Sequence, residues 1–446
     1  MKKDLTQGNV TRNMLLFAGP MILGNLLQQF YNIADTLIVG QFLGPDALAA
    51  VGSAYTLMTF LTSILIGMCM GSGALFSYYF GKKQEQKMKD SIRLSFLVIG
   101  GVTVLLNVLV MAFRRPILRL LQVPDSLMEM MHTYVWIIFT GIFFVFLYNY
   151  FAYLLRAVGN SVVPLYFLGS TAMLNVVLDL IFVTVCRWGI AGAAAATVIA
   201  QAVSGLGLMA YTWIREPQLR FSLLPFAPEK GAVGEILRFS FSSSIQQSVM
   251  NFGILMIQGL VNSFGPTVMA AFAAAVKIDS FAYMPAQEFG NAFSLFISQN
   301  HGAGRKDRVR EGMGSALRVS LLFCAAVSLL VFLFAPVLML LFISPLETEI
   351  IAVGAGYLRV EGAFYCGIGI LFLLYGYYRG VNRPEMSLVL TVISLGTRVA
   401  LAYLLAPVPA IGVLGIWSAI PIGWILADVT GILYLRRLER KTASAG

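Results

Sequence analysis

Runs of about 20 or more predominantly apolar residues recur along this chain, separated by short polar connections, and a helix of about that length crosses the hydrocarbon core of a bilayer. Only 12% of the 446 residues are charged and 58% are hydrophobic, whereas soluble domains carry about 25% charged residues. Strands of membrane barrels are much shorter than these runs. The chain is therefore predicted to be an all-α polytopic membrane protein.

The apolar runs predict twelve transmembrane helices. The first run starts near Met14 and continues past Asp35 without a small-residue cleavage site, so it is expected to be a retained helix rather than a signal peptide. The predicted spans lie near residues 14–39, 50–80, 92–113, 131–155, 163–186, 190–213, 238–262, 267–299, 314–342, 351–378, 385–406 and 412–435.

Basic residues concentrate in the connections on one side of these spans. Of the 31 Lys and Arg residues, 24 fall on that side, Lys2, Lys3 and Lys230 among them, and the other side holds only Arg114, Arg115, Arg119 and Arg187. Cytoplasmic loops of membrane proteins carry such an excess. A multi-pass protein of the cell (plasma) membrane with both termini cytoplasmic is predicted. Because these loops account for the net charge of +10, membrane lipids and no nucleic acid are the expected partners.

The chain contains an internal repeat of six spans. Sliding the sequence against itself by 221 residues aligns Gly44-Pro45 with Gly265-Pro266, and a shift of 223 aligns Arg156 with Arg379. Because six is even, both copies enter from the same side and form parallel repeats, two pseudo-symmetric six-helix lobes around a central cavity. The predicted domains are an N-terminal lobe at 1–213, a cytoplasmic linker at 214–235 and a C-terminal lobe at 236–446.

The sequence offers little for enzyme chemistry. It has no glycine-rich phosphate loop ending in Gly-Lys-Ser/Thr. Neither His132 nor His301 has a nucleophile and base pattern around it. The four cysteines lack metal-ligand spacing. We expect no enzyme and no cofactor beyond a coupling ion, H⁺ or Na⁺.

Acidic residues inside predicted spans are costly in lipid, so each is a candidate functional residue. The repeat serves as an internal control: the 221 shift places Met256 opposite Asp35, and Arg398 stands opposite Asp179 when loop lengths are allowed for. The carboxylate site is therefore expected in the N-terminal lobe only.

Four oxygen-bearing side chains are expected to converge there. At about 1.5 Å of rise per residue, Asp35, Asp179 and Thr197 each lie about 8 to 12 Å below the outer surface. Asn175 precedes Asp179 by four residues and so shares its helical face. Two carboxyl groups in a low-dielectric lobe titrate as a coupled pair and bind a proton. With the neutral oxygens of Asn175 and Thr197, the same four residues also suit Na⁺. The alternative is a purely structural hydrogen bond between helices.

Further polar positions are candidates with weaker signals. Pro20 interrupts the first span and is predicted to let it bend on ion binding, the alternative being a static kink. Lys277 and Asp279 are only two residues apart and are expected to contact other helices. Candidate cavity-lining residues, each of which also suits an ordinary interhelical contact, are Gln28, Tyr31, Asn149, Met256, Glu288, Glu361 and Arg398.

Several segments along the chain form a recognisable set. They are Pro20, the segment 32–40 (NIADTLIVG), 43–52 (LGPDALAAVG), 155–160 (LRAVGN), 175–179 (NVVLD), 189–192 (GIAG), 299–304 (QNHGAG) and 379–384 (RGVNRP). Together they resemble the multidrug and toxic compound extrusion (MATE) family over essentially the whole chain. The resemblance implies a twelve-helix, two-lobe transporter.

The N-terminal carboxylates resemble the DinF-type branch of that family. This implies ion coupling by Asp35, Asn175, Asp179 and Thr197, with Pro20 in the bending helix. In the NorM-type branch, acidic residues are expected in the seventh and tenth spans. Here the seventh span has none, and Glu361 lies early in the tenth.

The function expected is secondary active antiport, in which a small amphipathic or cationic substrate leaves in exchange for H⁺ and/or Na⁺. A monomer is expected to suffice. A flippase for lipids or lipid-linked oligosaccharides, which usually has a more cationic cavity, is left open by Arg359 and Arg398. A passive channel and a non-transporting membrane scaffold are the remaining alternatives.

Overall fold

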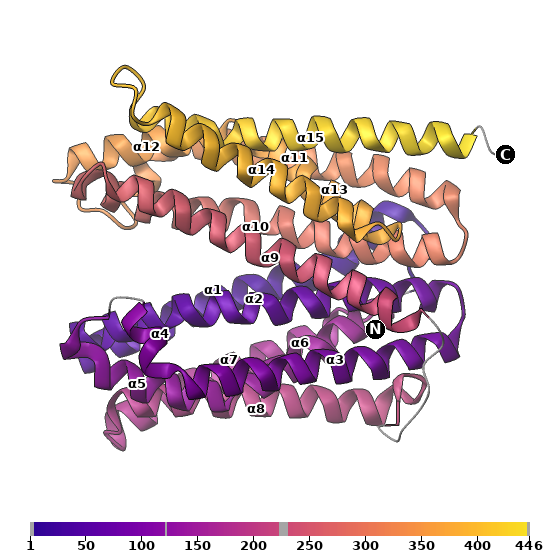
Figure 1. The fold of residues 1–446 in the computed structure, drawn as a ribbon, viewed down its shortest axis with the longest axis horizontal. Coiled ribbons are helices and arrows are strands. Elements are labelled where there is room, and N and C mark those ends of the chain that lie inside the picture. Colours follow the sequence, from indigo (N-terminus) through magenta and orange to yellow (C-terminus); the bar gives the residue numbers. More distant parts are fainter. Residues whose placement is uncertain (1–3, 121–122, 223–230, 444–446) are drawn as a thin grey trace. The chain divides into compact units, whose positions relative to one another are not determined.

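The computed structural model of the chain describes residues 4–120, 123–222 and 231–443, and within these ranges it is helical and contains no strand. Lys2, Lys3 and residues 223–230 of the predicted linker lie outside the described residues. The helices, coloured along the chain in Figure 1, are α1 (Val10–Leu43), α2 (Pro45–Gly81), α3 (Glu85–Ala112), α4 (Arg114–Leu120), α5 (Asp125–Thr140), α6 (Ile142–Ala157), α7 (Val162–Leu180), the π-helix η1 (Ile181–Val185), α8 (Gly189–Arg215), the 3₁₀-helix η2 (Pro217–Leu219), α9 (Ala232–Asn262), α10 (Pro266–Gly302), α11 (Lys306–Met339), α12 (Thr348–Gly362), α13 (Tyr365–Gly380), α14 (Pro384–Leu405) and α15 (Val413–Ala443).

Eight helices of the described chain are long and apolar enough to cross a membrane, and two bent helix pairs raise the number to ten. The helices α1 and α9, with 34 and 31 residues, are long enough to cross a membrane but are not among these apolar helices. They occupy the first and seventh predicted spans. Apolar side chains stay exposed on several helices, for example Leu322, Leu333 and Val337 on α11. Such a surface suits lipid rather than water.

Two predicted spans are not straight helices. The span expected at 131–155 consists of α5 and α6, bent by 43°, and that expected at 351–378 consists of α12 and α13, bent by 51°. The first break falls at Gly141, where an added Cβ would come within 2.9 Å of the Gln201 side chain. The close approach explains why glycine stands at this bend.

The predicted repeat is visible in the backbone. The helices α2 and α10 each have 37 residues and begin 221 residues apart. Each follows a glycine with a positive φ, 87° at Gly44 and 94° at Gly265, and starts with proline. Glycine adopts this conformation without a Cβ clash, and proline suits the first helical turn. The bent pairs α5–α6 and α12–α13 also correspond, so the six-span duplication extends to local geometry.

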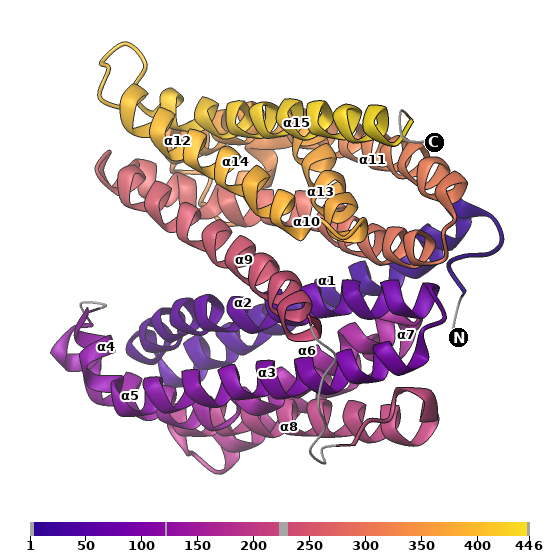
Figure 2. The ribbon, with the colours of Figure 1, turned by 45° about the vertical axis from the view of Figure 1, so that its right-hand side comes forward.

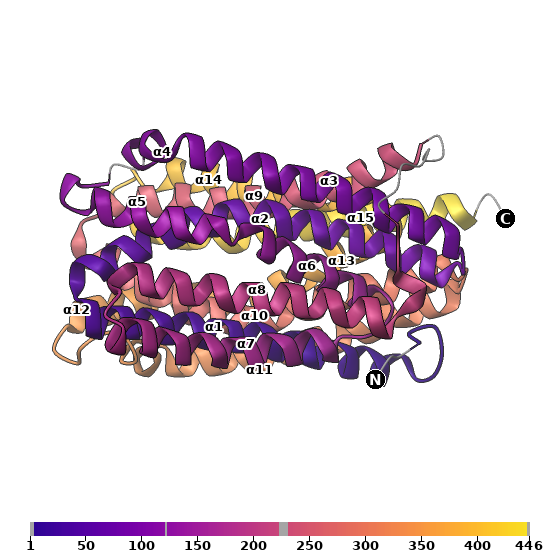
Figure 3. The ribbon, with the colours of Figure 1, turned by 90° about the horizontal axis from the view of Figure 1, so that it is seen from below.

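Contacts divide the chain into two compact units. Unit 1 comprises residues 1–4 and 19–244, and within it α2 packs against α3, α5 and α6 while α8 lies beside α7, as Figure 3 shows. Unit 2 comprises residues 5–18 and 245–446, and within it α10 packs against α11, α12 and α13. The helices α14 and α15 of unit 2 run side by side in Figure 2.

The two units are defined by contacts within the chain, and their limits differ from the domain boundaries predicted at residues 213 and 236. Those boundaries stay a prediction. Both α1 and α9 pass from one unit into the other, after Ala18 and after Ser244. In unit 2, the buried Arg308 donates hydrogen bonds to the backbone oxygens of Leu5 and Gly8. In unit 1, the first part of α9 packs so closely on α2 that a Cβ at Gly71 would meet the backbone oxygen of Phe239 at 2.1 Å.

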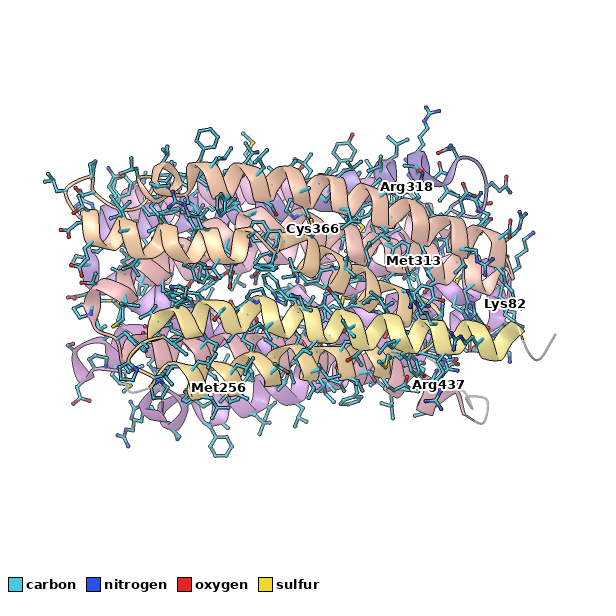
Figure 4. All side chains as sticks on the ribbon, turned by 90° about the horizontal axis from the view of Figure 1, so that it is seen from above. Lys82, Met256, Met313, Arg318, Cys366 and Arg437 are labelled. Carbon is cyan, nitrogen blue, oxygen red and sulfur yellow. The ribbon has the colours of Figure 1, made fainter. Side chains whose placement is uncertain are left out.

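Basic side chains mark one end of unit 2. Figure 4 shows Arg318 and Arg437 toward the end at which α15 finishes, with Met256 away from it. Which side of the membrane this end faces stays a prediction. The all-helical architecture of the described residues agrees with the predicted all-α fold class.

Candidate ion and substrate sites

A pair of carboxyl groups lies inside unit 1. Asp35 comes from α1 and Asp179 from α7, and the two side chains are in hydrogen-bonding contact. Asp179 is completely buried. One oxygen of each carboxyl group, the Oδ1 atom, is buried and has no hydrogen-bond partner within the described part of the chain. Buried polar atoms are rarely left unpaired. The two unpaired oxygens are therefore candidate positions for binding a proton or a small cation.

Neutral oxygens surround the pair. With its amide turned to suit both neighbours, Asn175 donates from its nitrogen to Asp179 Oδ2 at 2.8 Å, and its oxygen accepts from the Thr197 backbone N–H at 3.2 Å. Thr197 is also in side-chain hydrogen-bonding contact with Tyr31. The four predicted ion-coupling residues, Asp35, Asn175, Asp179 and Thr197, are therefore brought together as the helical spacing predicts.

Beside this cluster lies a cavity of about 340 Å³. Among the described residues that line it, Asp35 is the only acidic one, and none is Lys, Arg or His. The wall combines amide and hydroxyl side chains with aromatic rings. Its lining includes Gln28, Gln29, Tyr31, Asn32, Tyr55, Tyr134, Phe144, Tyr148, Asn149, Asn175, Thr197 and Gln201. The volume is within the range of small-molecule sites, about 300 to 1,000 Å³, and the wall suits an amphipathic molecule with a positive charge.

Unit 2 contains a second buried cluster, built differently. Asp279 of α10 and Glu361 of α12 are in hydrogen-bonding contact, and both are at most 5% exposed. Tyr365 at the start of α13 donates to Asp279 Oδ1 at 2.7 Å. Arg398 of α14 acts electrostatically on both carboxyl groups. Two acids and one base thus share this site.

A smaller cavity of about 100 Å³ lies against the second cluster. Asp279, Glu361 and Arg398 all line it, together with the aromatic side chains Phe272, Tyr283, Tyr357, Phe372, Tyr375 and Trp424. Glu361 Oε1 and Arg398 Nε are buried without hydrogen-bond partners among the described residues. The cavity therefore presents unpaired polar atoms of both charge types.

The predicted cavity-lining residues fall into three groups. Gln28, Tyr31 and Asn149 line the unit-1 cavity. Glu361 and Arg398 line the unit-2 cavity. Met256 and Glu288 lie outside both of these cavities: the Met256 backbone oxygen accepts from Tyr403 at 3.5 Å, and Glu288 accepts from Asn291 at 3.2 Å. Pro20 lies inside the continuous helix α1. The roles assigned to all these residues stay predictions.

Several residues of these sites were not singled out from the sequence. Asp279 was expected only to contact another helix, although an acidic residue in an apolar span is itself a signal of function. Tyr55, Tyr134 and Gln201 carry no such signal, because tyrosine and glutamine are common at helix contacts. Among the described residues, no group of three or more His, Cys, Asp or Glu side chains gathers as a metal site. A sodium site would thus draw on the neutral oxygens.

The chain matches the family model named MatE over residues 20–181 and 240–404. A probable multidrug resistance protein, YpnP of Bacillus subtilis, is 32% identical and is matched over 88% of this chain and 87% of the relative. A probable multidrug resistance protein, NorM of Thermotoga maritima, is 26% identical over 92% of this chain and 88% of its own length. A FAD transporter of Shewanella oneidensis is 23% identical over 97% and 95%.

Solved structures share the fold. An outward-facing MATE transporter of the MOP superfamily superposes with a TM-score of 0.91 at 23% identity, over 97% of this chain and 96% of that chain. A MATE structure in a bent conformation also gives 0.91 at 23% identity, over 99% and 98%. Members of this family are transporters rather than enzymes. The chain belongs to the MATE family of multidrug efflux transporters, with a twelve-helix membrane fold.

Proposed function

We propose that this transporter is a secondary active antiporter, which exports amphipathic or cationic small molecules in exchange for H⁺ and/or Na⁺ at Asp35 and Asp179. The proposal rests on a carboxyl pair, in which Asp179 is buried and Asp35 faces the adjoining cavity, whose described lining contains no basic residue. An ion that neutralises the pair removes the negative charge to which a cationic substrate is attracted.

The exchange follows from linkage between the two ligands. If an ion and a substrate each bind more tightly when the other is absent, each lowers the affinity for the other by the same factor. Asp35 belongs to both the carboxyl pair and the cavity wall. A proton or sodium ion arriving at Asp35 therefore favours release of the substrate.

The lining of the unit-1 cavity favours cations over anions. One relative is named as a transporter of FAD, an anionic compound, and lipid-linked oligosaccharides are anionic as well. Neither is suited to a wall in which Asp35 is the only charged side chain among the described lining residues. The multidrug relatives fit this wall better. We therefore favour drug and metabolite export over a flippase.

Pro20 is proposed to let α1 respond to the ion. It lies two residues beyond Ala18, where α1 passes from unit 2 into unit 1. Proline removes one backbone hydrogen bond and weakens a helix locally. Relatives with this fold have been solved in conformations described as bent and straight. We further propose that a monomer with both termini in the cytoplasm carries out transport.

The test is dye uptake into everted membrane vesicles, which corresponds to efflux from the cell. It is driven separately by an imposed proton gradient and an imposed sodium gradient. Wild-type protein is expected to respond to at least one gradient, and Asp35→Asn and Asp179→Asn to neither. Asp46→Asn is the matched control, because Asp46 is an exposed acid in the first turn of α2. Equal gradient-driven efflux in all variants would overturn the proposal.

A further inference from the structure

We propose that the unit-2 cavity is a second binding site, which takes a zwitterionic head group: an ammonium group at Asp279 and Glu361, and a carboxylate at Arg398. The inference deepens the proposed function by naming a substrate class, amphipathic molecules that carry an amine and a carboxylate. It depends on that function for its role in transport, whereas the binding itself is independent of it.

The charges of the cluster select such a group. The carboxyl groups of Asp279 and Glu361 are in contact with each other, and Arg398 acts on both. An inorganic cation would meet the fixed positive charge of Arg398 in the same cavity, and an anion would meet two carboxyl groups. Only a ligand with both signs finds a partner for each end.

Unpaired atoms point to a ligand independently of the charges. Glu361 is 1% exposed, and its Oε1 atom has no hydrogen-bond partner; Arg398 Nε is also buried and unpaired within the described chain. Both residues line the cavity. Buried polar groups are normally hydrogen-bonded, and leaving them unpaired is unfavourable. An ammonium donor and a carboxylate acceptor would satisfy these two atoms together.

The size of the cavity limits what can enter. At about 100 Å³, it is well below the volume of about 300 Å³ at which drug-sized sites begin. An amino-acid head group fits such a space, whereas a whole drug does not. Aromatic side chains of Tyr283, Phe372 and Trp424 border it. They suit the apolar remainder of the ligand and can face an ammonium group favourably.

The repeat shows that the site is specific to unit 2. The 221 shift places Met58 opposite Asp279, and the 223 shift places Ile138 opposite Glu361. Both apolar residues line the unit-1 cavity. The two cavities therefore present different charges from corresponding positions, which argues for two ligands rather than two copies of one site.

Equilibrium binding of three labelled probes to the purified full-length protein tests the inference. The probes are phenylalanine, its methyl ester, which is only a cation, and N-acetylphenylalanine, which is only an anion. Phenylalanine is expected to bind at least about tenfold more tightly than either derivative, since each derivative loses one charge-assisted contact.

Variants assign the two ends of the ligand. Arg398→Met should abolish the preference for phenylalanine over the ester: phenylalanine loses the partner of its carboxylate, and the ester no longer meets the positive charge of Arg398. Arg398→Lys should restore part of the preference. Glu361→Gln should weaken both amines. Arg359→Met is the matched control, because Arg359 is an exposed arginine on α12. Size-exclusion chromatography of each variant excludes misfolding as the cause.

Equal affinity for phenylalanine and its ester, unchanged phenylalanine binding in Arg398→Met, or no binding of any probe would each overturn the inference. Binding that persists in Asp35→Asn while gradient-driven efflux is lost agrees with both proposals. Binding in a wild-type protein that shows no gradient-driven efflux would contradict the antiport proposal alone.

Discussion

Unit 1 and unit 2 are copies of one six-span repeat, yet their buried charges differ. In unit 1 the acids come from α1 and α7, as Asp35 and Asp179, and none of the described residues that line the cavity is basic. In unit 2 the corresponding helices α9 and α14 carry Met256 and Arg398, and the acids come from α10 and α12. The two copies share one helix arrangement, but the side chains that line their cavities differ in charge.

This difference in charge indicates which of the two clusters can exchange an ion. A carboxyl pair without a fixed counter-charge changes its net charge whenever an ion enters or leaves. Asp279 and Glu361 instead experience the fixed positive charge of Arg398. Removing one member of a buried pair of opposite charges lowers stability more than removing one of two like charges. Substitutions in the two clusters are therefore expected to have different effects.

The largest effect is expected for Asp35→Asn in unit 1. Gradient-driven efflux should fall by at least about tenfold, since an amide binds neither a proton nor sodium as a carboxylate does. The midpoint of thermal unfolding in detergent should stay unchanged or rise, because one of two neighbouring like charges is gone. A lower midpoint together with lost efflux would show that Asp35 is structural.

Arg398→Met in unit 2 should instead destabilise the fold. It leaves two buried carboxyl groups without their positive partner, at a cost of up to about 3 kcal/mol. Tryptophan fluorescence during heating measures this loss. Adding Glu361→Gln to the same protein should recover most of it, since the second charge is then absent. A double variant as unstable as Arg398→Met would contradict the charge balance inferred for unit 2.

Asn175→Leu should weaken ion coupling in unit 1 without abolishing it. The substitution removes the hydrogen bond of 2.8 Å from the amide to Asp179 Oδ2. A hydrogen bond to a charged group contributes about 1.5 to 3 kcal/mol. The ion concentration needed for half-maximal efflux should therefore shift by about tenfold or more. An unchanged concentration dependence would exclude Asn175 from the ion site.

The smallest effect is expected for Tyr365→Phe in unit 2. It removes the hydroxyl that donates to Asp279 Oδ1 at 2.7 Å and leaves the ring in place. The loss should be about 1 kcal/mol, the usual net contribution of one hydrogen bond. Thermal unfolding of the purified protein measures it. A loss as large as that of Arg398→Met would mean that Tyr365, not Arg398, is the main partner of the acids.

Regular patterns along the sequence made much of the fold predictable. Apolar runs located the spans, and the 221-residue shift found the repeat that Gly44 and Gly265 express in their backbone angles. The spacing of Asn175 and Asp179 predicted one helical face, and the structure brings these residues together. Both signals are regular along the chain, so they can be read without tertiary contacts.

Features that depend on contacts between helices were not predictable. The bend at Gly141 coincides with a close approach to Gln201, which lies 60 residues later in the chain. The meeting of Asp279 with Glu361 joins helices separated by a third, α11, and no spacing rule connects them. The passage of α1 into the other unit after Ala18 likewise depends on contacts with residues around Arg308.

The most direct test of the central claim is substrate binding to the purified protein, measured across a range of pH and of sodium concentration. In the wild type, one of the two ions should compete with a cationic dye and lower its apparent affinity. In Asp35→Asn that dependence should disappear. The same dependence on pH and sodium in both proteins would show that the carboxyl pair of unit 1 does not exchange its ion for substrate.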